Sequence, residues 1–120
     1  MKKQSLILTL ALVVLTFFGC KPPKEFIDSI LDNFTSEDIL LLQNEVNLLS
    51  YIVDKAYEKG MQIALNPSPF NEKLNDVDLT KVSIFLLNEV EGGQITGLVD
   101  PDEVLEKMRE MFPKAKIVLT

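Results

Sequence analysis

Apolar and polar residues between residues 25 and 65 alternate with the period of an α-helix. Apolar side chains recur at helical spacing from Phe26 to Phe34, which predicts a short first helix. Thr35, followed three residues later by Asp38, is a capping pattern that predicts the start of a second helix. This long helix is predicted to end between residues 60 and 65. Its apolar positions alternate spacings of three and four residues: Ile39, Leu42, Val46, Leu49, Val53 and Ala56.

Residues 82–90 fit two different structures. As a helix, this segment would begin at Asp78 and end at Gly92. As a strand, it would lead through a turn at residues 91–94 into a second strand at residues 95–99, which forms a β-hairpin. The hairpin is favoured because residues 116–120 have the composition of a strand and need a partner for their backbone groups.

The clearest local pattern lies at residues 100–113. Asp100 is suited to cap a helix, Pro101 to occupy its first position and Pro113 to end it, so a helix of about three turns is predicted. Residues 66–78 are rich in turn-forming residues and are expected to connect the elements on either side. The expected fold is therefore a helix-rich α+β domain, with two N-terminal helices, a β-hairpin, a helix and a C-terminal strand. A small all-α bundle is the alternative.

The first twenty residues have the layout of an export signal. Lys2 and Lys3 precede an apolar run over residues 6–18, and Gly19 and Cys20 follow it. The run is shorter than the roughly 20 residues that cross a bilayer. The residues Phe17-Phe18-Gly19-Cys20 resemble the lipobox of bacterial lipoproteins, with Phe17 in the place usually held by Leu.

That resemblance implies three parts of the chain. Residues 1–19 would be a signal peptide removed during export, residues 20–24 a lipidated short tether, and residues 25–120 a single globular domain. Cys20 would carry fatty chains such as palmitate and anchor the protein to a membrane of the cell envelope. Lys21 after the cysteine implies the outer membrane if the host has two membranes.

Composition narrows the functions that the chain can have. The 120 residues suit one domain, and the net charge of −6 opposes binding to nucleic acid. The chain has no His and one Cys, so the commonest general base and an internal disulfide are absent from its sequence. The carboxylates Asp76 and Asp78, like Asp100 and Asp102, are explained by turns and helix caps. We therefore expect no enzyme activity, no cofactor and no metal site.

The expected function is protein–protein interaction at the cell envelope surface, by a small exported lipid-anchored lipoprotein. The candidate interaction face is the stripe of the long predicted helix: Ile39, Leu42, Val46, Leu49 and Val53. The membrane, through the lipid anchor, and a protein of unknown identity are the expected partners. A binding module for an apolar small molecule or lipid is the alternative, and an enzyme that uses carboxylates alone is a weaker third class.

Overall fold

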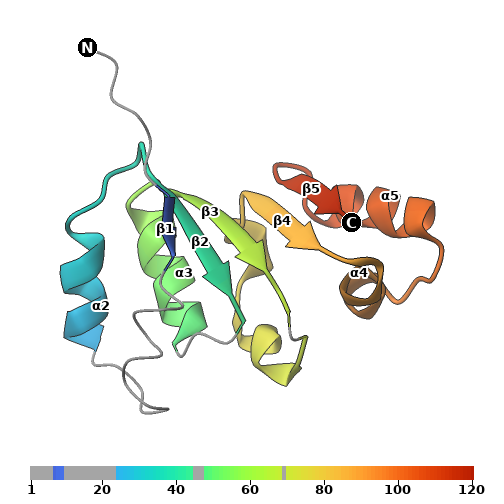
Figure 1. Cartoon of the computed structure of the whole chain (residues 1–120), viewed down its shortest axis with the longest axis horizontal. Helices are drawn as coiled ribbons and strands as arrows, with labels where there is room; N and C mark the ends of the chain where they lie inside the picture. The colour runs from blue at the N-terminus through green and yellow to red at the C-terminus, as the bar shows by residue number, and fades with distance from the viewer. Residues whose placement is uncertain (1–6, 10–23, 45–47, 69) are drawn as a thin grey trace.

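Short, mainly apolar runs along the chain form the strands of one parallel sheet (Figure 1). The structure is a computed structural model that describes residues 7–9, 24–44, 48–68 and 70–120. The strands are β1 (Ile7–Thr9), β2 (Ile39–Gln43), β3 (Gln62–Asn66), β4 (Ile84–Leu87) and β5 (Lys116–Leu119). They lie side by side in sequence order, and every neighbouring pair is parallel.

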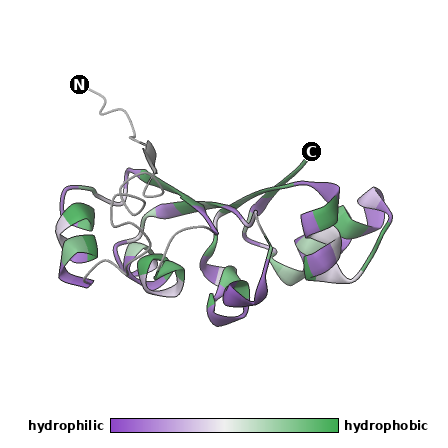
Figure 2. Ribbon diagram, turned by 60° about the horizontal axis from the view of Figure 1, so that its bottom comes forward, coloured by the Kyte–Doolittle hydropathy of each residue, from purple (hydrophilic) through white to green (hydrophobic). Residues whose placement is uncertain are grey.

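The helices lie together on one face of this sheet, as Figure 2 shows. They are α2 (Lys24–Leu31), α3 (Leu49–Glu58), α4 (Glu89–Thr96) and α5 (Pro101–Met111), with two short 3₁₀ turns, η1 (Glu72–Asp76) and η2 (Leu79–Lys81). Connections between parallel strands are almost always right-handed. Strands that follow one another in sequence order therefore send each connection to the same face.

The two faces of the sheet differ in burial because side chains alternate along each strand. On β2, Leu40 and Leu42 are fully buried against the helices, whereas Ile39 and Leu41 are only half-buried. The same alternation holds on β4. We call the side without helices the open face of the sheet. Its residues are Ile39, Leu41, Gln43, Gln62, Ala64, Asn66, Ile84, Leu86, Lys116 and Val118.

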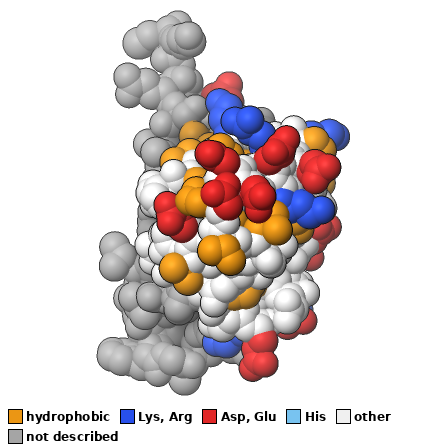
Figure 3. Space-filling model, turned by 90° about the vertical axis from the view of Figure 1, so that its right-hand side faces the viewer, with side chains coloured by type: hydrophobic (Ala, Val, Ile, Leu, Met, Phe, Trp, Pro, Cys, Tyr) orange, Lys and Arg blue, Asp and Glu red, His pale blue; other side chains and the backbone are white. Residues whose placement is uncertain are grey.

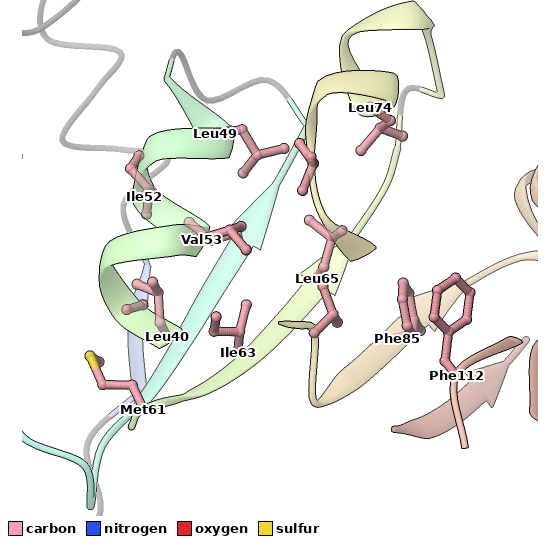
Figure 4. Packing of buried hydrophobic residues seen from close by; sticks show 14 of the residues in the cluster. Leu40, Leu49, Ile52, Val53, Met61, Ile63, Leu65, Leu74, Phe85 and Phe112 are labelled. Carbon is pink, nitrogen blue, oxygen red and sulfur yellow. The ribbon is translucent and has the colours of Figure 1, made fainter. Parts of the chain in front are cut away.

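The hydrophobic core lies between the sheet and the helices (Figure 4). Leu40, Ile63 and Leu65 from the strands pack beneath Ile52 and Val53 of α3, and all five have no exposed surface. At the other end, the rings of Phe85 and Phe112 lie 4.8 Å apart between centroids. One continuous core therefore holds the strands and helices together.

The strands of the sheet carry very few charged side chains. The strands β2 to β5 contain Lys116 and no acidic residue. Figure 3 shows the end of the molecule formed by α4, α5 and β5, where acidic side chains gather at the surface. The exposed acidic residues of α5 are Asp102, Glu103, Glu106 and Glu110.

The predicted α+β fold is wrong, because the sheet is wholly parallel and alternates with helices as an α/β fold. The long helix expected from Thr35 onward is instead β2, α3 and β3. The apolar stripe on which this prediction rested combined residues of strand β2 with residues of helix α3. The helix α3 ends at Glu58 with Lys59 as its C-cap, and Gly60, whose φ is 78°, takes the chain out of helical geometry. The Met61 N–H then donates to the Ala56 carbonyl at 3.0 Å.

The predicted β-hairpin is also wrong, and so is the alternative of an all-α bundle. The strand interpretation of residues 84–87 agrees with β4, but residues 89–96 form α4 rather than a turn and a second strand. The C-terminal strand β5 finds its partner in β4, in parallel register with Ile84 beside Lys116. The helices α4 and α5 together form the crossover that parallel pairing requires.

Two local predictions are confirmed. The first helix is α2, which buries Ile27 and Leu31. The predicted helix after residue 100 is α5, in which Pro101 is the first residue and the Asp100 carboxylate accepts a hydrogen bond from the Glu103 N–H at 3.1 Å.

Close packing of α4 against the core depends on Gly92. A Cβ atom at this position would lie 2.6 Å from Cγ1 of Val104. We expect Gly92→Ala to lower the free energy of unfolding by about 1–3 kcal/mol through overpacking, although alanine favours helices. Urea denaturation measures this loss, and the same substitution in a Val104→Ala background should cost less. An equal loss in both backgrounds would contradict the contact.

Candidate functional site

Polar residues end four successive strands. Asn44 follows β2, Asn66 is the last residue of β3, Asn88 follows β4 and Thr120 follows β5. Because parallel strands end at the same edge of a sheet, this topology brings the four positions to the carboxyl edge. In open α/β sheets ligands bind outside this edge, at the point where the strand order reverses. The described strands lie in sequence order without such a reversal, so a site here depends on the local side chains.

A hollow of about 280 Å³ lies at this edge, on the side of the open face. The described residues that line it come from the ends of β3, β4 and β5 and from the start of α4: Asn66, Ser68, Leu86, Leu87, Asn88, Glu91, Val118 and Thr120. We call it the edge hollow. Its floor is aliphatic and its rim carries amide, hydroxyl and carboxylate groups.

A reciprocal capping box holds two of these residues in place at the start of α4. Oδ1 of Asn88 accepts a hydrogen bond from the Glu91 N–H at 2.9 Å, and Oε2 of Glu91 accepts one from the Asn88 N–H at 3.1 Å. Glu91 is 6% exposed, so its carboxylate is largely withdrawn from water. The two residues therefore form a rigid side of the edge hollow.

The other sides are fixed by backbone contacts. Oδ1 of Asn66 accepts a hydrogen bond from the Ser68 N–H at 3.1 Å, which turns the chain after β3. The Thr120 N–H donates to the Leu87 carbonyl at 2.9 Å, which continues the β4–β5 ladder. After these contacts, the Asn66 amide NH₂ and the Thr120 hydroxyl oxygen can still donate to or accept from a ligand.

The chemistry of the edge hollow favours a neutral, hydrogen-bonding ligand. Its described lining has no Lys or Arg to balance a phosphate, and Glu91 has the one side chain in it that ionises near neutral pH. Amides and hydroxyls supply donors and acceptors in the same place, as hydroxylated molecules require. Among the described residues, no group of three or more His, Cys, Asp or Glu residues is placed to hold a metal ion.

A second hollow, of about 530 Å³, separates α2 from α3 and is lined mainly by charged residues of both signs. Beside it, the Tyr51 hydroxyl donates to the Asp28 carboxylate at 2.7 Å. This hydrogen bond is the main cause that raises the pKa of the Tyr51 phenol to about 12. The Lys59 ammonium donates to the Leu31 carbonyl at 2.7 Å and so caps α2. Asp28 and Lys59 therefore each form a hydrogen bond between the two helices.

The residues of the expected interaction face are not brought together on one surface. Leu42, Leu49 and Val53 are buried beneath the helices, and Ile39 lies on the open face. Val46 lies outside the described residues, as does Cys20, the expected lipidation site.

The carboxylates considered from the sequence have local roles. The Asp78 carboxylate accepts hydrogen bonds from the side chain and backbone of Thr80, which lower its pKa. Asp100 caps α5, as predicted. The edge hollow was not predicted from the sequence, although Asn44, Asn66 and Asn88 each close an apolar run at a spacing of 22 residues. That recurrence is the signal that could have located it.

The chain is similar to a known protein in its fold. No family model matches the chain. Among solved structures, a ribokinase from Giardia lamblia is similar to it, with a TM-score of 0.53 and 23% sequence identity. The similarity covers 81% of this chain and 33% of the ribokinase, so this chain spans a third of that protein's length. At this identity the likeness concerns the fold alone. No described helix combines the length and the apolar character needed to cross a bilayer.

The capping box predicts that Asn88 stabilises the domain. Asn88→Ala removes the acceptor for the Glu91 N–H and should lower the free energy of unfolding by about 1 kcal/mol. Asn88→Ser is the matched control, because serine caps helices about as well as asparagine and should retain most of this stability. Urea denaturation of the three proteins checks the prediction, and equal losses for alanine and serine would contradict it.

Proposed function

We propose that this chain is a membrane-tethered binding protein that takes a small hydroxylated molecule in its edge hollow. The observation that carries this proposal is the convergence of Asn66, Asn88 and Thr120, from the ends of three neighbouring strands, on one hollow. The rigid capping box supports it, because preorganised polar groups bind without a further ordering cost.

Binding is proposed rather than catalysis. The carboxylate of Glu91 is tied to the Asn88 N–H and largely buried, which leaves it poorly placed to exchange a proton with a ligand. The mixed lining also suits a sugar-like molecule better than the apolar ligand considered from the sequence.

Ribose is the first ligand to test, because the similar solved structure is that of a ribokinase. A pentose presents several hydroxyls and a small apolar surface, which complement amides around an aliphatic floor. The absence of cations from the described lining makes an uncharged sugar a better candidate than a phosphorylated one.

The place of binding is proposed from the N-terminus. The lipobox resemblance supports a lipid on Cys20, which would hold the domain at the surface of a cell-envelope membrane, the outer one in a host with two membranes. Two or three acyl chains give a lasting anchor, at ~0.8 kcal/mol for each buried methylene.

Interaction with a protein partner is the second candidate function. The apolar residues of the open face favour it, among them Val118, which is 43% exposed. Asn66, Leu86 and Val118 belong to both surfaces, so a partner that covers this end of the open face would also cover the edge hollow.

The ligand proposal predicts a loss of binding when Asn66 is changed. Asn66→Leu replaces the amide by an apolar side chain of similar shape, so the dissociation constant for ribose in isothermal titration calorimetry should rise at least about tenfold, the equivalent of about 1.4 kcal/mol. Gln62→Leu is the matched control, because Gln62 lies at the opposite end of β3 on the same face and should leave affinity unchanged. Equal effects of the two substitutions, or no heat with ribose on the unchanged protein, would contradict the proposal.

The anchor proposal predicts that Cys20→Ala blocks processing. Mass spectrometry should then find residues 1–19 still attached and no fatty chain, whereas the natural protein should begin at an acylated Cys20. Phe17→Leu restores the usual lipobox residue and should process at least as well as the natural chain. Incorporation of labelled palmitate into the Cys20→Ala protein would show that another residue is acylated.

A further inference from the structure

The outer edge of β2 is covered by a strand from the start of the chain. Ile7, Leu8 and Thr9 of β1 pair in parallel with residues 39–41 of β2. On its other side β2 pairs with β3 along all five of its residues. The strand β1 therefore occupies a backbone pairing site at the edge of the sheet.

This edge strand lies within the segment that the proposed processing removes. Residues 1–19 include β1, whereas the core residues whose burial the structure describes lie between Ile27 and Phe112. Removal of the leader would leave the packed layers of β2 to β5 intact. It would also leave alternate N–H and C=O groups of β2 without a strand partner.

The sequence of β2 has no charged residue or proline, two of the features that protect an edge strand. It reads Ile-Leu-Leu-Leu-Gln, without Lys, Pro or an acidic residue. The opposite edge strand, β5, starts with the exposed Lys116. Charged residues on an edge discourage further pairing, so β2 is the edge that is more open to another strand.

The net charge of the protein favours a strand from another protein over a second copy of this chain as the partner. The leader holds two lysines and no acidic residue, so its loss changes the net charge from −6 to −8. Two copies paired edge to edge would repel one another, whereas a neutral or basic strand from another protein would not.

We propose that in the processed protein β2 binds an extended, uncharged apolar segment of a partner protein, parallel to β2 and in the place of β1. This inference rests on the proposed removal of the leader and names the mode of the protein interaction. Main-chain hydrogen bonds supply the binding, as in other cases of strand addition. On the open face, Ile39 and Leu41 are half-buried and offer apolar contacts to the incoming strand.

A peptide with the sequence of residues 5–11 and a C-terminal lysine tag serves as the probe. It is added to the processed protein purified from membranes in detergent, and hydrogen exchange of residues 39–43 is measured. We expect at least tenfold slower exchange with this peptide and no change with the Leu8→Pro peptide, which lacks one backbone donor.

Two protein variants separate edge binding from adsorption to detergent. Leu41→Lys places a charge on the edge strand and should weaken peptide binding at least tenfold. Gln62→Lys places the same charge on β3, on the same face, and should leave binding unchanged.

Failure of this proposal can be distinguished from failure of the anchor. A protein that mass spectrometry shows to begin at Cys20, but whose β2 residues exchange at the same rate with and without peptide, overturns strand addition alone. Protection of residues 39–43 in a stable dimer, detected by light scattering, also overturns it in favour of a second copy. A protein that retains residues 1–19 overturns both proposals.

Discussion

The parallel pairing of neighbouring strands in sequence order is the constraint on which the rest of this structure depends. Right-handed connections then place every helix on one face, so the core forms on that side and the open face keeps only partial cover. The same order aligns the strand ends, which brings Asn66, Asn88 and Thr120 to one edge. The edge hollow and the open face are therefore two consequences of one topology.

Local signals in the sequence predicted the elements whose boundaries depend on capping. Asp100 and Pro101 specify the start of α5 through groups within one turn of the chain, so no tertiary information is needed. The strands were harder because buried parallel strands are continuous apolar runs, which periodicity alone cannot separate from a buried helix. The stripe from Ile39 to Val53 crossed from β2 into α3 for this reason. Gly60, one of the ends considered for the long helix, is the left-handed residue just beyond the C-cap of α3.

Prediction of the edge hollow would have required the order and register of the strands. Asn66 was predicted to begin a connector after a long helix, whereas it is the last residue of β3. Its proximity to Asn88 and Thr120 depends on the order and register of β3, β4 and β5. Composition identified the carboxylates as structural, and Asp78 and Asp100 do cap their turns. Composition could not indicate that uncharged amides and a hydroxyl would form the polar rim.

The N-terminal segment matters for the proposed protein interaction, because its strand β1 pairs with the edge of β2. A parallel sheet with a bare apolar edge exposes unsatisfied backbone groups and invites aggregation. While β1 is attached, its pairing with residues 39–41 satisfies part of that edge. Cleavage during export would remove β1 and leave the edge of β2 unpaired, close to the membrane. This edge is separated from β4 and β5 by β3. Asn66 of the edge hollow is paired in register with Gln43 of β2, so β3 joins the two proposed sites and a strand added at β2 would act on the hollow through β3.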